Sequence, residues 1–311
     1  MGQAVSPASE FFRTPGEIAA LFLTTAPTVR SCWQVRPPPG LRQYEWLIIA
    51  FFTYVAVIAP FFIPHGSRRW LPAVVAAFVC VVVLFLPRGN QHVRDWIPLV
   101  LTFTAFREMN WFTPSVRDYH LERSWIGWDR WLLDTAHLRA AIESLGPLIP
   151  SYLEICYLLV YVIALISSVI LLTNHRRDQL NTFWLAFLAG TLSSYALFPY
   201  FPSDPPRVVF AGQDLPHIVT VFRRFNLAIL GQYGIHSSVF PSAHVSAAFA
   251  CAWALLITMP DRKIYGGLVA LFAFSVATAT IYGRYHFVAD ALAGFAISFL
   301  ALAALSQRSK V

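Results

Sequence analysis

Long apolar segments alternate with short polar ones along most of the chain. Seven mostly apolar segments come close to the ~20 residues that an α-helix needs to cross ~30 Å of hydrocarbon. They lie at 46–63, 70–86, 148–172, 183–201, 239–259, 264–281 and 287–305. Because only helices and closed barrels satisfy their backbone groups in lipid, this pattern predicts an all-α fold, a polytopic bundle of transmembrane helices.

An eighth segment, 96–106, is shorter and contains Pro98. It reaches spanning length only if residues up to 112 join it across Arg107 and Glu108. If 96–112 spans, the chain crosses the membrane eight times and both termini share one side; otherwise it crosses seven times. We expect eight crossings.

The composition excludes an ordinary soluble domain. Of the 311 residues 57% are hydrophobic and only 13% are charged, whereas about 25% charged residues is typical of soluble proteins. The net charge of +7 is not gathered into a Lys/Arg stripe with interleaved aromatic residues, so no nucleic-acid partner is expected. The four cysteines form no close pair, which indicates core residues rather than a metal site or a disulfide framework.

We expect one membrane domain with three parts. These are a tail at 1–44, N-terminal transmembrane helices at 45–147, and a catalytic core at 148–306. In the tail, residues 14–17 resemble a helix start before an apolar run too short to span, which indicates an interfacial helix or, alternatively, a disordered tail. A polar segment with Trp125, Trp128 and Trp131 fits a helix at the headgroup level.

The basic residues predict the orientation. Clusters at 175–177 and 261–263, and Arg308 with Lys310 at the C-terminus, are separated by even numbers of crossings. All three therefore lie on one side, which the positive-inside rule makes cytoplasmic. With eight crossings the N-terminus is cytoplasmic too. The protein is then a multi-pass protein, expected in the cell membrane, with the 202–238 loop and the 282–286 turn on the non-cytoplasmic face.

Two polar residues, His286 and Asp290, stand four apart at the start of the last apolar segment. On a helix this spacing places both on one face. The carboxylate can accept from one imidazole N–H and leave the other nitrogen free as a nucleophile or base. Taken alone, such a pair is more often two solvated residues at a helix end than a functional site.

A second polar segment, Phe240-Pro241-Ser242-Ala243-His244, opens another apolar run. Proline near the first turn and free backbone N–H groups favour an anion at the helix start. His244 is then positioned to protonate a leaving oxygen. The alternative is an ordinary helix N-cap.

A third segment, 201–207, ends in Pro205-Pro206-Arg207. The prolines restrict the backbone, and the planar fork of Arg207 suits two phosphate oxygens. Arg284 is a candidate second cation, although a single arginine at a membrane interface is ordinary. Because all three segments fall on one face of the membrane, we predict a phosphoryl-transfer site without a metal.

The order Pro-Pro-Arg, Pro-Ser-x-His and His-x-x-x-Asp resembles the type 2 phosphatidic acid phosphatase superfamily, over about residues 148–305. The resemblance implies a six-helix catalytic core and no cofactor. It also implies that His286 is a nucleophile that forms a phosphohistidine, that Asp290 orients it, and that His244 is the general acid. Arg207, Ser242 and Arg284 would hold the phosphate.

The sequence departs from the phosphatase pattern in three places. The first motif has no lysine, Ala243 replaces a glycine, and Thr280 stands where an arginine is expected. A phosphate site with fewer cations is either completed by Arg284 from a different turn, or binds a diester better than a doubly charged monoester. Together with the Phe-Pro-x-x-Pro-Pro-Arg form, this indicates the inositol phosphorylceramide synthase-like branch, which transfers its group to an alcohol.

We therefore expect a membrane enzyme that acts on a phospholipid or sphingolipid and passes the phosphoryl-bearing group to an inositol-like alcohol or to water. The alternatives are a non-catalytic lipid-headgroup binder or transporter that retains the pocket, and a purely structural bundle. Glu154, inside an apolar segment, is expected to make a structural polar contact rather than to take part in catalysis. The sequence predicts no oligomeric state.

Overall fold

The fold is a bundle of helices, described by a computed structural model over residues 40–63, 65–85 and 90–308. The helices are α2 (Gln43–Phe62), α3 (Leu71–Phe85), α4 (Gln91–Met109), α5 (His120–Arg130), α6 (Leu138–Glu143), α7 (Leu148–Leu159), α8 (Ile163–Thr173), α9 (Leu180–Leu197), α10 (Pro206–Val209), α11 (Val221–Tyr233), α12 (Ala243–Thr258), α13 (Lys263–Tyr282) and α14 (Val288–Arg308). Within these ranges the chain has no strand, so the all-α prediction is confirmed. The expected helix at 14–23 lies outside the described residues.

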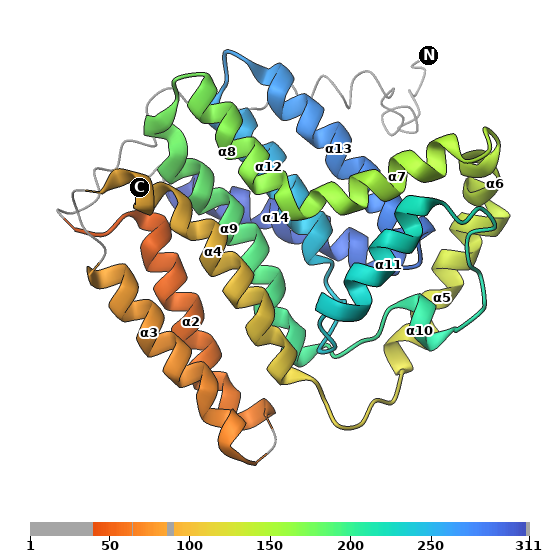
Figure 1. The fold of residues 1–311 in the computed structure, drawn as a ribbon, viewed down its shortest axis with the longest axis horizontal. Coiled ribbons are helices and arrows are strands. Elements are labelled where there is room, and N and C mark those ends of the chain that lie inside the picture. Colours follow the sequence, from red (N-terminus) through yellow and green to blue (C-terminus); the bar gives the residue numbers. More distant parts are fainter. Residues whose placement is uncertain (1–39, 64, 86–89, 309–311) are drawn as a thin grey trace, which may run out of the picture.

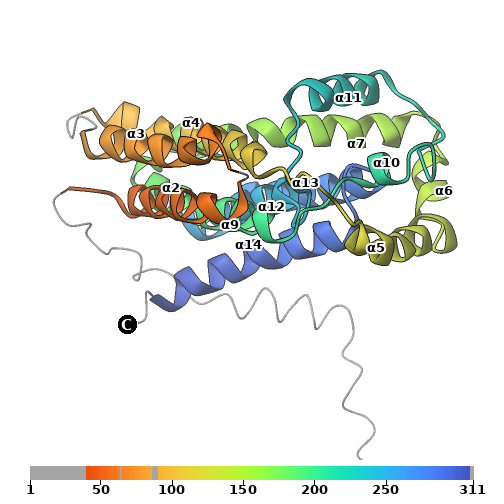
Figure 2. The ribbon, with the colours of Figure 1, turned by 90° about the horizontal axis from the view of Figure 1, so that it is seen from below.

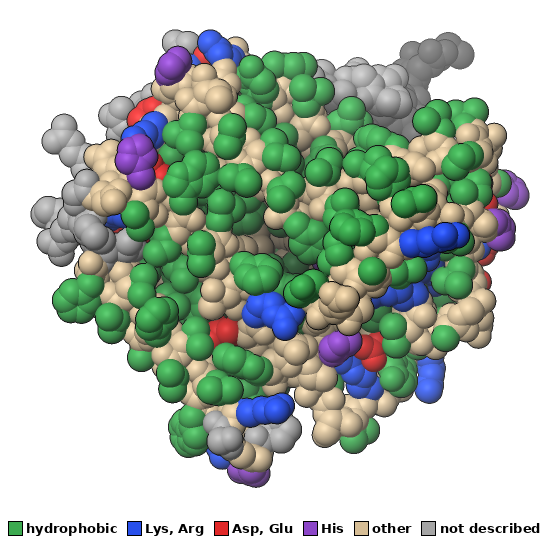
Figure 3. Space-filling model, in the orientation of Figure 1, with side chains coloured by type: hydrophobic (Ala, Val, Ile, Leu, Met, Phe, Trp, Pro, Cys, Tyr) green, Lys and Arg blue, Asp and Glu red, His purple; other side chains and the backbone are tan. Residues whose placement is uncertain are grey.

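Six segments of the described chain are long and apolar enough to cross a membrane. They are Gln43–Phe62, Arg68–Phe85, Leu148–Thr173, Arg177–Tyr200, Lys263–Tyr282 and Val288–Leu305. The shorter apolar helix Ala243–Thr258 is a seventh candidate. Five of these seven follow residue 147, where the resemblance implies a six-helix core. Hydrophobic side chains cover much of the face in Figure 3, as expected for a surface in contact with lipid.

The helix α4 is not among these candidates, because charged residues at both of its ends lower its hydropathy. It carries Arg94 and Asp95 near its start and Arg107 and Glu108 near its end. It nevertheless runs beside the spanning helix α9 (Figure 1). The eighth crossing therefore stays a prediction.

The centre of the bundle is α12, which packs against α9, α13 and α14. Small side chains permit this: Ala248, Cys251 and Ala252 are fully buried, and small residues let membrane helices approach closely. A Cβ atom on Gly190 of α9 would lie 2.9 Å from the Cβ of Ala250. This tight packing holds the start of α12 close to the start of α14.

The segment 148–172, predicted as one spanning helix, is interrupted. A 3-10 turn at Val160–Val162 separates α7 from α8, and the two helices meet at an angle in Figure 1. The turn brings Tyr157 and Tyr161 against His244, with ring centroids 5.2 and 5.3 Å from the imidazole.

The helices α2, α3 and α4 lie on one side of the bundle (Figures 1 and 2). Ion pairs with buried carboxylates attach α2 and α4 at one end. Asp95 accepts from Arg42 and from Arg177, each at 2.7 Å, and Arg94 pairs with the buried Glu45. This end is separated from the polar segments described next by the length of α9, ~27 Å for its 18 residues.

Candidate active site

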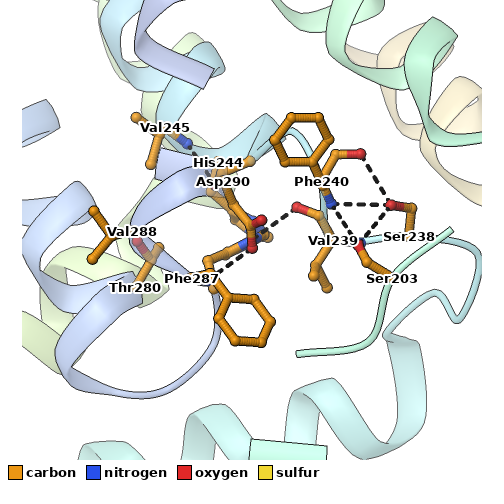
Figure 4. Close-up of polar contacts among 12 residues, drawn as sticks. Ser203, Ser238, Val239, Phe240, His244, Val245, Thr280, Phe287, Val288 and Asp290 are labelled. Carbon is orange, nitrogen blue, oxygen red and sulfur yellow. Dashed lines mark hydrogen bonds and ion pairs between the residues drawn. The ribbon is translucent and has the colours of Figure 1, made fainter. Parts of the chain in front are cut away.

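The three polar segments meet at one end of the bundle. Nδ1 of His244, in the first turn of α12, lies 3.3 Å from Nε2 of His286, which precedes α14. Figure 4 shows His244, Asp290 and the backbone of Val239 gathered around this point. At 3.3 Å the nitrogens are in hydrogen-bond contact, so a phosphorus atom fits between them only after one ring rotates.

The surroundings of His286 select its tautomer. Its Nδ1 lies 3.0 Å from the carbonyl oxygen of Val239 and 3.3 Å from Oδ2 of Asp290. A carbonyl oxygen only accepts hydrogen bonds. The proton of the neutral ring therefore lies on Nδ1, and Nε2 carries the lone pair that faces His244.

The carbonyl of Val239 is itself fixed by the first polar segment. The backbone N–H of Val239 donates to the carbonyl of Ser203 at 3.2 Å, and that of Phe240 donates to Oγ of Ser203, also at 3.2 Å. Ser238 contacts the same hydroxyl at 3.1 Å, and Figure 4 shows both serines beside Val239 and Phe240. The first segment thus positions the carbonyl that orients His286.

The turn before α14 explains why His286 points into the bundle. Its N–H and that of Tyr285 both donate to the carbonyl of Thr280, at 3.0 and 2.9 Å. Asp290 folds back, and its Oδ2 accepts from the N–H of Phe287 at 2.8 Å. The same carboxylate therefore caps α14 and contacts the imidazole, which makes the position of His286 depend on the helix start.

Ser242 is fully buried at the start of α12. Its hydroxyl accepts from the N–H of Val245, and its own N–H donates to the carbonyl of Asp290 at 2.9 Å. The residue thus caps α12 and joins it to α14. Its expected contact with phosphate stays a prediction.

Arg207 lies in the short helix α10, with its guanidinium carbon 5.4 Å from the centroid of the Tyr285 ring. Among the described residues, no carboxylate pairs with this guanidinium and no group accepts a hydrogen bond from it. Burial, followed by the nearby charge of Arg207, lowers the pKa of His286 to about 3. A cation without a counter-ion thus stands beside the two histidines, where an anion would be stabilised.

Arg284 lies elsewhere. It has a left-handed φ of 61°, is fully buried, and forms an ion pair with Asp129 of α5; a second carboxylate, Asp214, is 4.0 Å away. Its charge is already balanced by these two carboxylates. We therefore do not retain Arg284 as a phosphate ligand, and Arg207 remains the cation of the site.

The sequence reasoning missed a buried network on the other side of the His286 turn. Glu154 accepts from Arg223 at 3.1 Å and from the hydroxyl of Tyr285 at 2.7 Å. The same Nη1 of Arg223 donates to the carbonyl of Gly283 at 3.0 Å, and Asn226 donates to Glu154 at 2.7 Å. The expected structural contact of Glu154 is thus observed. Arg223 and Asn226 stand three residues apart on one face of α11, a 13-residue helix. This spacing is the sequence feature that could have indicated a shared partner for the two side chains.

The low pKa of His286 leads to a prediction for the pH profile. Because that pKa lies below the ordinary value of 6.5, the ring stays neutral and nucleophilic above pH ~4, and protonation removes it only nearer pH 3. We expect no fall in kcat/KM from His286 between pH 8 and 5, since kcat/KM reports groups of the free enzyme. A loss with a midpoint near 6.5 that persists in His217→Ala, which removes an exposed histidine, would contradict this.

Among the described residues, no group of three or more His, Cys, Asp or Glu is arranged to hold a metal ion. The chain was also compared with known proteins. A family model described as the PAP2 superfamily matches residues 124–304. No curated protein and no solved structure matches.

Proposed function

The chain belongs to the PAP2 superfamily, and from this premise we propose that it is a membrane enzyme that transfers a phosphoryl-bearing group from a lipid through a phosphohistidine at His286. One observation carries the proposal. The Val239 carbonyl and Asp290 hold Nδ1 of His286, so that Nε2 faces His244 beside the unpaired cation of Arg207.

The first half of the proposed reaction forms the covalent intermediate. His244 rotates away, and Nε2 of His286 attacks phosphorus. The N–P bond forms as the bond from phosphorus to the lipid alcohol oxygen breaks. His244, held as the imidazolium by the negative charge of the bound phosphate, gives a proton to that oxygen and becomes neutral. Arg207 and the N-terminal N–H groups of α12 stabilise the negative charge on the other phosphate oxygens.

The second half restores the enzyme. The hydroxyl of water or of an alcohol attacks phosphorus, the N–P bond breaks, and His244 accepts the proton of the attacking oxygen. Neither half of this scheme uses a nucleotide or a metal ion. Hydrolysis and transfer differ only in which hydroxyl occupies the position that the lipid alcohol leaves.

The charge of the site favours a phosphodiester. A monoester carries two negative charges near neutral pH, whereas a diester carries one. With Arg284 balanced by Asp129, Arg207 is the single cation without a counter-ion near the histidines in the described chain, which suits one negative charge. We therefore propose a phospholipid or sphingolipid diester as substrate and an inositol-like alcohol as acceptor, as in the inositol phosphorylceramide synthase-like branch.

Covalent trapping tests this function. Purified protein is incubated with lipids labelled with ³²P in the headgroup, quenched, and digested for mass spectrometry under conditions that preserve phosphohistidine. We expect label on His286, and more of it from diesters than from phosphatidic acid. Headgroup binding without label or product from any lipid in the panel would instead favour the non-catalytic binder.

We also propose that the site faces away from the cytoplasm. Arg176 pairs with Asp261 at 2.5 Å, so the two basic loops adjoin each other at the end of α12 and α13 opposite the histidines. The positive-inside rule makes that end cytoplasmic. In a cysteine-free background, we expect an impermeant maleimide to label Ala211→Cys in intact cells but Asp178→Cys only after lysis. The reverse pattern would overturn the orientation.

A further inference from the structure

The helix α5 lies across the end of the bundle where the three polar segments meet (Figures 1 and 2). Its inward face consists of Glu122, Ile126 and Asp129, which are 2%, 8% and 0% exposed, whereas Trp128 on the opposite face is 57% exposed. Spacings of three and four residues place side chains on one side of a helix. The buried carboxylates require partners there, because an unpaired buried charge is costly.

Glu122 holds the first polar segment. Its Oε1 accepts from the backbone N–H of Asp204 at 2.9 Å, three residues before Arg207. The contact fixes the path of the chain as it enters α10.

Trp125 holds the second segment and touches the third. Its ring stacks on Phe240 with centroids 5.0 Å apart and planes 25° apart, and it meets Phe287 edge-on at 5.7 Å. Such aromatic pairs have preferred geometries, so they restrict orientation as well as distance. Phe240 adjoins the Val239 carbonyl that orients His286, and Phe287 directly follows His286.

Asp129 holds the third segment at two points. Its Oδ1 accepts from the N–H of Val288 at 2.8 Å, and its Oδ2 pairs with Arg284. These two residues stand two positions after and two before His286. Nε and Nη2 of Arg284 are buried without a hydrogen-bond partner, so the guanidinium depends on Asp129 to offset its charge.

We propose that α5 positions the site for phosphoryl transfer, with the Asp129–Arg284 pair setting the place of His286. The inference rests on the proposed function. Asp129 and Arg284 act through His286 and touch no reacting atom, so they are positioning residues. The pair holds the nucleophile in place relative to His244 and Arg207. Loss of the Asp129 charge leaves the buried guanidinium, two residues from the nucleophile, with only Asp214 at 4.0 Å as a counter-charge.

The variant Asp129→Asn tests the pair, because it keeps an oxygen for the Val288 N–H and removes the charge. Asp95→Asn is the matched control: Asp95 is also buried and paired with arginine, but lies at the other end of the bundle. We expect Asp129→Asn to lower kcat on a diester lipid by about 10- to 100-fold, with KM within about threefold. Asp95→Asn should lower thermal stability comparably while kcat stays within about twofold.

The double variant Asp129→Asn/Arg284→Gln separates positioning from general damage. It removes both charges, so no buried cation is left unpaired, and its kcat should be no lower than that of Asp129→Asn alone. If Asp129→Asn does not fold, Asp129→Glu, which retains the charge, is expected to fold with intermediate kcat. A kcat for Asp129→Asn equal to that for Asp95→Asn would overturn the inference.

A readout without substrate distinguishes this inference from the proposed function. Diethyl pyrocarbonate modifies neutral imidazole, and mass spectrometry gives the rate at His286. We expect Asp129→Asn to change that rate at least fivefold and Asp95→Asn to leave it unchanged. Equal rates of His286 modification in Asp129→Asn and Asp95→Asn would overturn the positioning role. Retained turnover in His286→Ala would instead overturn the proposed function alone.

Discussion

Replacing His286 with alanine is expected to reduce turnover of a diester lipid by about 10⁴-fold or more, since loss of a covalent nucleophile has effects of this order. The imidazole is the only side chain in the proposed scheme that bonds to phosphorus. The measurement is the release of diacylglycerol or ceramide by purified protein in mixed micelles. It should be accompanied by melting curves that show a folded variant.

The matched control for this experiment is His217→Ala. His217 is also a histidine paired with a carboxylate, Glu143 at 2.9 Å, but its side chain is 75% exposed. Its replacement should leave turnover within about twofold. If His286→Ala retained a tenth of wild-type turnover, the assignment of the nucleophile would be wrong.

Replacing His244 with alanine is expected to cost about 10²- to 10⁴-fold on a lipid substrate, the range for general acid catalysis. The expected loss depends on the leaving group. A lipid alcohol leaves poorly without a proton, whereas p-nitrophenolate leaves without one. The His244→Ala variant should therefore recover most of its first-step rate on a p-nitrophenyl phosphodiester, measured as the burst of p-nitrophenolate.

The leaving-group test also distinguishes the loss of acid catalysis from displacement of the nucleophile His286. A variant that only displaces the nucleophile, such as Asp129→Asn, should lose rate on both substrates in proportion. An equal loss of His244→Ala on lipid and p-nitrophenyl substrates would show that His244 does not protonate the leaving oxygen. The 3.3 Å contact with His286 would then be a structural one.

The motif residues that the sequence singled out came together because each stands at a helix end. Apolar segments of spanning length must place their ends at one face or the other of the bilayer, so their order alone assigned His244 and His286 to the same face. The i, i+4 spacing of His286 and Asp290 was sufficient to predict their contact. Packing of small residues between α9, α12 and α14 then brought the helix ends that carry His244 and His286 close together.

Arg284 shows where this reasoning fails. Its position two residues before His286 suggested a phosphate ligand, but the turn gives it a left-handed φ of 61° and directs it toward Asp129. The partner lies 155 residues earlier in the chain, in a segment whose tryptophans indicated only an interfacial helix. No local pattern relates the two residues.

The sequence by itself determined the fold class, six of the segments long and apolar enough to span, and the common end of the bundle at which the polar segments lie, because these follow from hydrophobic length and helical period. Only the tertiary structure decided which arginine keeps an unpaired charge, which tautomer His286 adopts and what holds its turn. Those properties depend on contacts of Asp129, Val239 and Glu154 with residues distant in the chain. Burial makes such contacts necessary, and the order of residues does not specify them.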